Sequence, residues 1–281
     1  MHPVNLPYFD LILDALAAGD IPITTAFGRH IHWGYWSESP NHTPTPEEFA
    51  QAAERLTHEV YNAGLVTAGQ RVLDAGCGFG GAIASLNENL TAMDLTGLNI
   101  DPRQLAQAKT KVTPTVGNSI QWVEGDACAL PFPDGSFDRV LAVECIFHFP
   151  DRRQFFQEAW RVLKPGGYLA LSDFVPQVWL IPFLELGAAL QLKPGFYGGV
   201  NVSYAVEHYR TLAADLGFQP HMERDITKNT LPTYDFLFNL GSKKGIDWSQ
   251  WSAFYQTLQI TLASRLHWVK YMILAYQKPE N

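Results

Sequence analysis

Cysteine, clustered basic residues and long apolar runs are scarce in this sequence, and each scarcity argues against a class of protein. The three cysteines, Cys77, Cys128 and Cys145, stand in separate strand-like contexts and form no Cys-x-x-Cys pair, so neither disulfides nor a zinc site is expected. The net charge is −8 and no run of Lys or Arg is present to follow a phosphate backbone, so nucleic acid is not an expected partner. The longest apolar stretches contain charge or proline or are shorter than the roughly 20 residues of a membrane span. Because the N-terminus also lacks the basic start of a secretory signal, we expect a cytoplasmic protein without a membrane span.

The length and the pattern of apolar residues predict an α/β fold. A chain of 281 residues, 47% of them hydrophobic, can bury a full core, and we expect one domain over 1–281. Between residues 71 and 175, apolar runs alternate with helical patterns, which is typical of a mostly parallel sheet with helices on both faces. The predicted strands lie at 71–77, 94–100, 120–126, 137–144, 167–174, 218–227 and 267–278, and predicted helices lie near 81–88, 103–112, 153–162 and 205–216.

Three regions outside the central alternation differ from it in character. Residues 1–66 precede the first predicted strand and are expected to form an N-terminal helical flap over the core at 67–175. Residues 176–204 are rich in aromatic residues, proline and glycine without strand alternation, and we interpret them as an inserted lid. Residues 205–281 return to the sheet, interrupted by a second aromatic and helical insertion near 235–264.

The stretch VLDAGCGFGG, residues 72–81, combines a buried strand, an acidic residue and spaced glycines at a helix start. Gly76, Gly78 and Gly80 permit positive φ and close approach of a ligand, and free N–H groups at the helix start favour electron-rich ligand atoms. Dinucleotide-binding proteins place GxGxxG in the same context, but here the third glycine comes one residue early. Asp74 stands where a carboxylate meets a cationic group and repels a pyrophosphate. The loop therefore favours a positively charged ligand over a dinucleotide.

With these motifs, the sequence resembles the class I S-adenosylmethionine-dependent methyltransferases, whose first motif reads as a strand, an acidic residue and GxGxG. The likeness extends over about residues 67–175 and includes EGDACALPFPDGSFDRVLAVECIFHFPD and EAWRVLKPGGYLALSDF, at the spacings of the family's third to fifth strands. The resemblance implies a Rossmann-like, seven-stranded, mostly parallel sheet. It also implies S-adenosyl-L-methionine as cofactor, with S-adenosyl-L-homocysteine as product. The subgroup indicated is the small-molecule type that includes tocopherol, sarcosine and sugar methyltransferases.

The resemblance implies further cofactor contacts after the second and third strands. The family usually offers the ribose an acidic residue at the end of the second strand, and this sequence departs from that pattern with Asn99, whose amide forms weaker hydrogen bonds. Gln104 matches a subgroup that tolerates a neutral residue there, although a solvated helix position is the alternative. Asp101 is interpreted as a helix N-cap before a proline, not as a substitute for the acid. Asp126 and Ala127 match the pair that faces the adenine edge, with an Asp ending a strand at a turn as the alternative.

The stretch RHIHWGYW, residues 29–36, gathers two histidines and three aromatic residues before the first strand. His30 and His32 have no further metal ligands near them in the sequence, which argues against a metal site. Burial alone explains the tryptophans. The resemblance adds a third interpretation, because the subgroup carries a similar H-x-GYW element in an extension that folds over the cofactor. On that analogy Tyr35 is expected in the cofactor pocket, near the methionine carboxylate and the sulfonium.

Glu144 and His148 follow the fourth strand and are the candidates for catalysis. Open α/β sheets bind ligands at the carboxyl ends of their strands, and a spacing of four places both side chains on one face if the segment is helical. We predict that His148 is a general base for an oxygen acceptor, because imidazole titrates near neutral pH; a contact without acid–base function is the alternative. Glu144 is expected to face the sulfonium or to orient an acceptor hydroxyl, with capping of the following turn as the alternative.

Aromatic residues in the two insertions predict an apolar pocket for the acceptor. The predicted acceptor contacts are Trp179, Phe183, Tyr197 and Tyr234. Further aromatic residues of these segments are Phe196, Trp248, Trp251 and Phe254. Core packing accounts for about half of the set in the alternative interpretation. Such a pocket implies a hydrophobic or aromatic small molecule as acceptor.

The leading hypothesis is methyl transfer to an oxygen or carbon of a small apolar metabolite, as in natural-product biosynthesis. N-methylation of a small amine such as a glycine derivative is the second hypothesis, and it requires a more polar pocket with a carboxylate-binding Arg. A protein that binds S-adenosylmethionine without transferring the methyl group is the third. An NAD-dependent oxidoreductase is disfavoured by the glycine spacing and by Asn99. The acceptor and the oligomeric state do not follow from the sequence.

Overall fold

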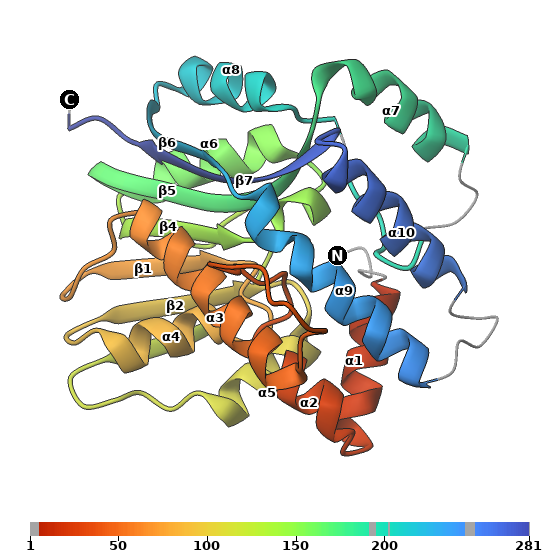
Figure 1. Ribbon diagram of the computed structural model, residues 1–281. Coiled ribbons are helices and arrows are strands. Elements are labelled where there is room, and N and C mark those ends of the chain that lie inside the picture. Colours follow the sequence, from red (N-terminus) through yellow and green to blue (C-terminus); the bar gives the residue numbers. More distant parts are fainter. Residues whose placement is uncertain (1–5, 191–194, 202, 245–250, 281) are drawn as a thin grey trace.

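A seven-stranded sheet forms the centre of the protein, as the sequence predicts (Figure 1). The computed structural model describes residues 6–190, 195–201, 203–244 and 251–280. The strands are β1 Arg71–Ala75, β2 Asp94–Asn99, β3 Ser119–Glu124, β4 Phe137–Val143, β5 Leu163–Pro176, β6 Gln219–Asp225 and β7 Val269–Gln277. Their order is β3-β2-β1-β4-β5-β7-β6, with β1 to β5 parallel and β7 antiparallel to both of its neighbours. The predicted seven-stranded, mostly parallel sheet is therefore confirmed.

Helices cover both faces of the sheet and also gather beyond the carboxyl ends of its parallel strands. The described helices are α1 Pro7–Ala17, α2 Ile21–Phe27, α3 Pro46–Ala63, α4 Gly81–Asn89, α5 Pro102–Lys111, η1 Ile146–His148, α6 Arg152–Val162, η2 Val178–Leu180, α7 Ile181–Leu190, α8 Val206–Leu216, α9 Thr227–Lys244 and α10 Trp251–Arg265. α3, α4 and α5 pack on one face, whereas α6 and α8 cover the other (Figure 1). α1, α2, α9 and α10 lie beyond the strand ends, where open α/β sheets bind ligands (Figure 1). Within the described ranges, no helix is long and apolar enough to cross a membrane.

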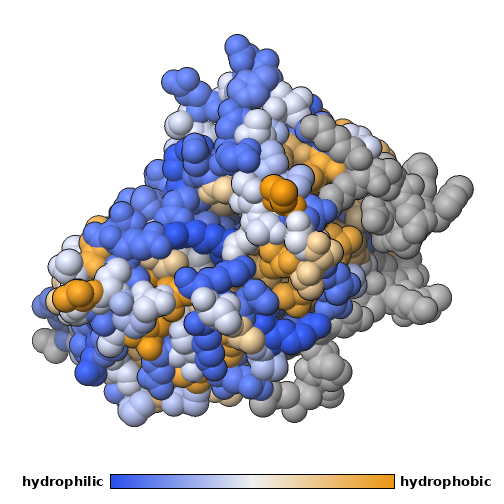
Figure 2. Space-filling view, turned by 90° about the horizontal axis from the view of Figure 1, so that it is seen from below, coloured by the Kyte–Doolittle hydropathy of each residue, from blue (hydrophilic) through white to orange (hydrophobic). Residues whose placement is uncertain are grey.

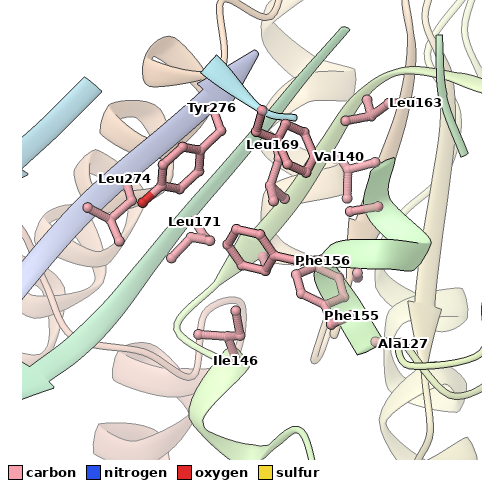
Figure 3. Close-up of a cluster of buried hydrophobic side chains, with 14 of the residues drawn as sticks. Ala127, Val140, Ile146, Phe155, Phe156, Leu163, Leu169, Leu171, Leu274 and Tyr276 are labelled. Atoms are coloured by element: carbon pink, nitrogen blue, oxygen red, sulfur yellow. The ribbon is translucent and has the colours of Figure 1, made fainter. Parts of the chain in front are cut away.

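Aromatic and aliphatic side chains of α6 join the sheet in the largest buried cluster (Figure 3). Phe155 and Phe156 are fully buried against the sheet, and the ring of Phe156 lies 5.7 Å from that of Tyr276 in β7. Leu169 and Leu171 of β5 complete the contact (Figure 3). Because burial of each such side chain contributes about 1.5–3 kcal/mol, this cluster fixes the strands whose ends carry the site.

Most predicted strand boundaries differ from the structure by a few residues, and the differences at β5 and β6 are described here. The strand predicted over 218–227 ends at Asp225, and α9 begins at Thr227 because the Asp225 carboxylate accepts hydrogen bonds from the backbone N–H and hydroxyl of Thr227. The sequence predicts a helix that ends near Val162 and a strand that begins at Gly167. Instead β5 already begins at Leu163, which pairs with Phe137 before the register shifts.

Gly97 of β2 offers a test of core packing. A Cβ at this position would lie 2.5 Å from the Trp122 ring and 3.1 Å from the Cys77 sulfur. We expect Gly97→Ala to lower the free energy of unfolding by about 1–3 kcal/mol in urea denaturation, because the added methyl group overpacks a close-packed contact. Gly187→Ala in exposed helix α7 is the control, because nothing lies within 4 Å of that Cβ. Equal stability of the two variants would contradict this account.

Candidate active site

A cavity of about 500 Å³ opens at the carboxyl ends of β1, β2, β3 and β4. It is lined by the glycine loop, by the ends of these strands and by residues of the N-terminal flap. The structure thereby brings together most of the predicted cofactor and catalytic residues. Those that line the cavity are Asp74, Gly76, Gly78, Asn99, Gln104, Asp126, Ala127, Glu144 and His148.

The glycines of the loop have two different functions. Gly76 has φ +88°, and a Cβ there would lie 2.7 Å from the Cys145 sulfur, so only glycine fits. Gly78 has φ +53° and lines the cavity, and a Cβ there would meet only Gln104 Oε1, at 4.0 Å. Gly80, predicted to contact the cofactor, does not line the cavity. It caps α4 at φ +78°, where a Cβ would lie 2.5 Å from the Trp122 ring.

Asp74 is a buried carboxylate with a free hydrogen-bonding oxygen. Its side chain lies at the end of β1 in the cavity wall, and Oδ1 has no hydrogen-bond partner among the described residues. Burial raises the pKa of Asp74 to about 7. A positively charged group in the cavity would supply the missing partner and favour the ionised form.

Amide groups, in place of the usual acid, line the cavity after β2. The Asn99 amide nitrogen donates to Gln104 Oε1 over 3.1 Å, and both side chains are buried. Gln104 is therefore not a solvated helix residue. Its amide nitrogen also hydrogen-bonds to the Asp101 carboxylate and keeps a second proton for a ligand. Asp101 caps α5 by accepting a hydrogen bond from the Arg103 backbone N–H, which confirms the predicted N-cap.

Asp126 and Ala127 lie in the cavity wall after β3. Asp126 Oδ1 accepts a 2.8 Å hydrogen bond from the backbone N–H of Cys128, so this carboxylate also stabilises the turn. The alternative, an Asp that holds a turn, is therefore observed, and the contact with the adenine stays a prediction for a residue that lines the cavity.

Histidines, and not the predicted tyrosine, bring the stretch 29–36 to the cavity. His30 and His32 line it, whereas Tyr35 does not. The backbone of Tyr35 is held against α3, with its N–H donating to the Ala52 carbonyl and its carbonyl accepting from Arg55. These contacts with α3 leave Tyr35 outside the cavity wall, and its contact with the cofactor stays a prediction.

Both histidines have protein partners that explain their burial. His32 Nδ1 lies 2.8 Å from the Trp33 carbonyl, which can only accept, so Nδ1 carries the proton. Burial lowers the pKa of His32 to about 3, which keeps it neutral. His30 Nε2 contacts the Glu54 carboxylate at 2.6 Å. In the described part of the chain, no group of three or more His, Cys, Asp or Glu is placed to hold a metal ion.

Glu144 anchors the flap to the sheet. Its Oε2 accepts hydrogen bonds from the Trp33 backbone N–H at 2.9 Å and from the hydroxyl of Tyr271 in β7. Its backbone adopts φ +49°, and its N–H donates to the Ser172 hydroxyl. Burial raises the pKa of Glu144 to about 8. The side chain lies at the cavity wall, but its Oε2 is already occupied by the flap and by Tyr271.

His148 carries an unprotonated ring nitrogen at the cavity. It ends the short helix η1, and its Nδ1 lies 3.2 Å from the Gly199 carbonyl, so Nδ1 donates and Nε2 keeps its lone pair. The hydroxyl of Tyr8 in α1 donates to Nε2 over 3.1 Å. Burial lowers the pKa of His148 to about 4. Glu144 precedes this one-turn helix, so the expectation that Glu144 and His148 share a helical face is wrong, although both line the cavity.

A second cavity of about 300 Å³ adjoins the first and is largely apolar. Helices α9 and α10 contribute to this cavity. Seen from below, hydrophobic residues are exposed in several patches, among them one right of the centre (Figure 2). Among the residues described, no Asp, Glu, Lys or Arg lines it. Three residues line both cavities: Tyr8, Ile31 and His32.

Only part of the predicted acceptor set reaches the second cavity. Tyr197 lines it, together with Phe196 and Phe254 from the same aromatic segments. Trp179 and Phe183 are 53% and 68% exposed on η2 and α7, and therefore do not form a pocket. Tyr234 is fully buried, and its hydroxyl bonds to Ser264. Trp248 and the side chain of Trp251 lie outside the described residues.

Sequence reasoning missed the contribution of the first helix. Four residues of α1 line the second cavity, spaced as one helical stripe: Tyr8, Leu11, Ile12 and Ala15. Apolar residues at i, i+3, i+4 and i+7 are the signature of one buried helix face, so the signal was present in PYFDLILDALA. The same spacing recurs in α9, where Thr233, Leu237 and Leu240 line the cavity.

Comparison with known proteins agrees with this geometry. A model of the methyltransferase domain family matches residues 73–171. The methyltransferase GfsG of Streptomyces halstedii is 34% identical over 211 residues, which are 74% of this chain and 72% of that protein. The 27-O-demethylrifamycin SV methyltransferase of Amycolatopsis mediterranei is 34% identical over 214 residues, 74% of this chain and 73% of that protein.

A solved structure shows the same fold over 98% of this chain. The geranyl diphosphate C-methyltransferase from Streptomyces coelicolor A3(2), in complex with Mg²⁺, geranyl diphosphate and S-adenosyl-L-homocysteine, gives a TM-score of 0.68 at 16% identity and covers 98% of this chain and 100% of its own. The family model, the two relatives and this fold together identify the family of the chain. The chain belongs to the class I S-adenosyl-L-methionine-dependent methyltransferases that act on small molecules, and S-adenosyl-L-methionine is its cofactor.

Proposed function

We propose that the protein methylates a hydroxyl oxygen of a neutral, largely apolar small molecule in natural-product biosynthesis. The observation that carries the proposal is the unprotonated Nε2 of His148 at the cofactor cavity, beside an uncharged second cavity. An oxygen acceptor must lose its proton as it attacks, and a fixed neutral imidazole is suited to receive it. The 27-O-demethylrifamycin SV methyltransferase, a relative, is itself named for an oxygen position.

The cofactor cavity fits S-adenosyl-L-methionine. Asp74, with its unpartnered oxygen, would hold the ammonium group, and the open backbone at Gly78 would allow the ligand to approach closely. Asn99 and Gln104 would hold the ribose hydroxyls, and Asp126 with the backbone after it would face the adenine. When bound, the cofactor supplies a methyl group on a positively charged sulfur.

The lining of the second cavity favours a neutral acceptor over a small charged amine. A glycine derivative carries a carboxylate, whose burial requires a cationic partner. No such cation is found among the described residues around this cavity. Arg29 lines the cofactor cavity, but its guanidinium is engaged by Glu54 and Glu88. A carbon acceptor remains the alternative outcome for the atom that is methylated.

To test the proposal, the protein is incubated with methyl-labelled S-adenosyl-L-methionine and one candidate acceptor per reaction. The products are then identified by mass spectrometry. We expect methyl ethers from apolar hydroxyl compounds such as 2-naphthol, and no methylation of sarcosine. Methylation of sarcosine alone would contradict the proposal, and carbon-methylated products would correct the acceptor atom. Absence of transfer despite cofactor binding, with a metabolite extract as well, would favour a binding protein without transferase activity.

Leu237 offers a test of the second cavity as the acceptor site. Its side chain lines that cavity but not the cofactor cavity. We expect Leu237→Glu to lower turnover of an apolar acceptor by about tenfold or more, because a buried unpaired carboxylate opposes an apolar ligand, while cofactor affinity stays within about twofold. Leu262→Glu is the matched control, because Leu262 is 51% exposed on α10 and lines neither cavity. An equal effect of the two variants would exclude this cavity as the acceptor site.

A further inference from the structure

We propose that Tyr8 is a catalytic residue that passes the proton of the acceptor to His148. The proposal rests on the proposed function and adds a group to it. Tyr8 lines both cavities, whereas His148 lines only the cofactor cavity. Tyr8 therefore connects a methyl acceptor in the second cavity with the imidazole. Its hydroxyl already hydrogen-bonds to His148 Nε2 over 3.1 Å.

Tyr8, His148 and the Gly199 carbonyl form a row of hydrogen bonds, and the carbonyl at its end fixes the direction of each bond. The Gly199 carbonyl only accepts, so His148 Nδ1 donates to it and Nε2 accepts the proton of Tyr8. A hydroxyl oxygen has one donor proton and two lone pairs. With its proton given to His148, the Tyr8 oxygen can only accept from a further group, and an acceptor hydroxyl is a suitable donor. The hydrogen bonds are thus donated in one direction, from the hydroxyl of the methyl acceptor to Tyr8 and from Tyr8 to His148.

One segment, residues 195–199, orients both members of the pair. The Phe196 carbonyl accepts the Tyr8 backbone N–H at 3.2 Å, and the Gly199 carbonyl holds the imidazole. The Tyr8 ring packs beside the rings of Phe196 and Tyr197, at centroid distances of 6.3 and 5.8 Å. Because these contacts fix both the phenol and the imidazole, little reorganisation is needed when the proton moves.

One methyl transfer and two proton transfers make up the proposed step. The acceptor oxygen forms its new bond to the methyl carbon, and the bond from that carbon to sulfur breaks with its electron pair left on sulfur. The acceptor O–H bond breaks, its proton goes to the Tyr8 oxygen, and the original Tyr8 proton goes to His148 Nε2. His148 ends as an imidazolium, and Tyr8 is a neutral phenol before and after the step. No further reactant is needed.

The test compares wild type with Tyr8→Phe, which keeps the ring and removes only the hydroxyl. The first measurement is the affinity of 2-naphthol for the protein saturated with S-adenosyl-L-homocysteine, by calorimetry. We expect a fall of about fivefold, the size of one lost hydrogen bond, with unchanged affinity for S-adenosyl-L-homocysteine. The second is the pKa of His148 by NMR, which should rise because Tyr8 no longer donates to the neutral form. Turnover of 2-naphthol should fall about tenfold or more.

Tyr255→Phe is the matched control, because Tyr255 is 59% exposed on α10 and lines neither cavity. Tighter binding of 2-naphthol to Tyr8→Phe would overturn the relay, because it would mean that Tyr8 competes with the acceptor for His148. Unchanged affinity and unchanged His148 pKa would reduce Tyr8 to packing and leave the proposed function intact. If wild type bound S-adenosyl-L-homocysteine but no 2-naphthol, the proposed acceptor class would fail, and the relay with it.

Discussion

Replacement of His148 by alanine is expected to lower turnover about 100-fold or more while changing cofactor affinity little. The imidazole is the only protein group in our proposal that gains a net proton, and its Nε2 is held unprotonated because Nδ1 donates to the Gly199 carbonyl. Steady-state rates with a methylated hydroxyl acceptor, together with calorimetry for S-adenosyl-L-homocysteine, separate the two effects. His221→Ala on exposed strand β6 is the control. Unaltered turnover in His148→Ala would remove this residue from the mechanism.

The pH profile gives an independent check of the same residue. Burial lowers the pKa of His148 to about 4 from an ordinary value of 6.5, so the basic form is present above about pH 4. At saturating S-adenosyl-L-methionine, where the pH dependence of cofactor binding does not limit the rate, turnover by wild type should therefore rise with pH through about 4 and stay level across pH 6.5, where an exposed imidazole would still be titrating. The residual activity of His148→Ala should lack the acid limb near pH 4. An acid limb centred at pH 6.5 would contradict the lowered pKa of His148.

Local patterns were sufficient to predict the sheet and the floor of the cofactor cavity. The strand, acid and glycine sequence from Asp74 to Gly78 dictates its own geometry, because each glycine supplies a backbone conformation or a clearance that other residues lack. The cap at Asp101 depends only on the residues next to it. Features whose causes lie within a few residues of chain are therefore readable from the sequence.

The flap was not predictable in detail because its orientation depends on distant contacts. The stretch 29–36 is fixed by a hydrogen bond from Trp33 to Glu144, and by the bond from Tyr35 to the Ala52 carbonyl of α3. These contacts hold Tyr35 against α3, while His30 and His32 of the same stretch face the cavity. Nothing in the local sequence decides which of these residues faces the cofactor.

The acceptor site shows a second limit, because aromatic content does not reveal the direction of a side chain. Phe183 lies exposed on α7, whereas Tyr197 lines the second cavity, although both come from the same aromatic stretch. The stripe that begins at Tyr8 had the stronger signal, since its helical spacing marks a face and not merely a composition. Spacing was the better guide to the pocket.

The second large effect is expected at Asp74. Asp74→Asn should weaken binding of S-adenosyl-L-homocysteine about 10- to 100-fold at pH 8, because a charge-assisted hydrogen bond to the ligand's ammonium group contributes about 1.5–3 kcal/mol. Burial raises the pKa of Asp74 to about 7, so at lower pH the ligand must first displace a proton. Affinity for wild type should therefore increase as pH rises through about 7, and Asp74→Asn should lose that dependence. Calorimetry between pH 5.5 and 8.5 measures both.

Stability of the unliganded protein should show the opposite sign. A carboxyl whose pKa is about 7 when folded and 3.8 ordinarily binds its proton more tightly in the folded state, so its contribution is present below pH 3.8 and is lost as pH rises through 7. The loss amounts to at most about 4 kcal/mol at 1.36 kcal/mol per pKa unit. Glu144 acts in the same direction with its pKa of about 8, so the difference between wild type and Asp74→Asn at each pH isolates Asp74. The asparagine variant should be the more stable protein at pH 8 and the weaker binder. A variant that is both less stable and unaltered in binding would show that Asp74 supports the loop and not the ligand.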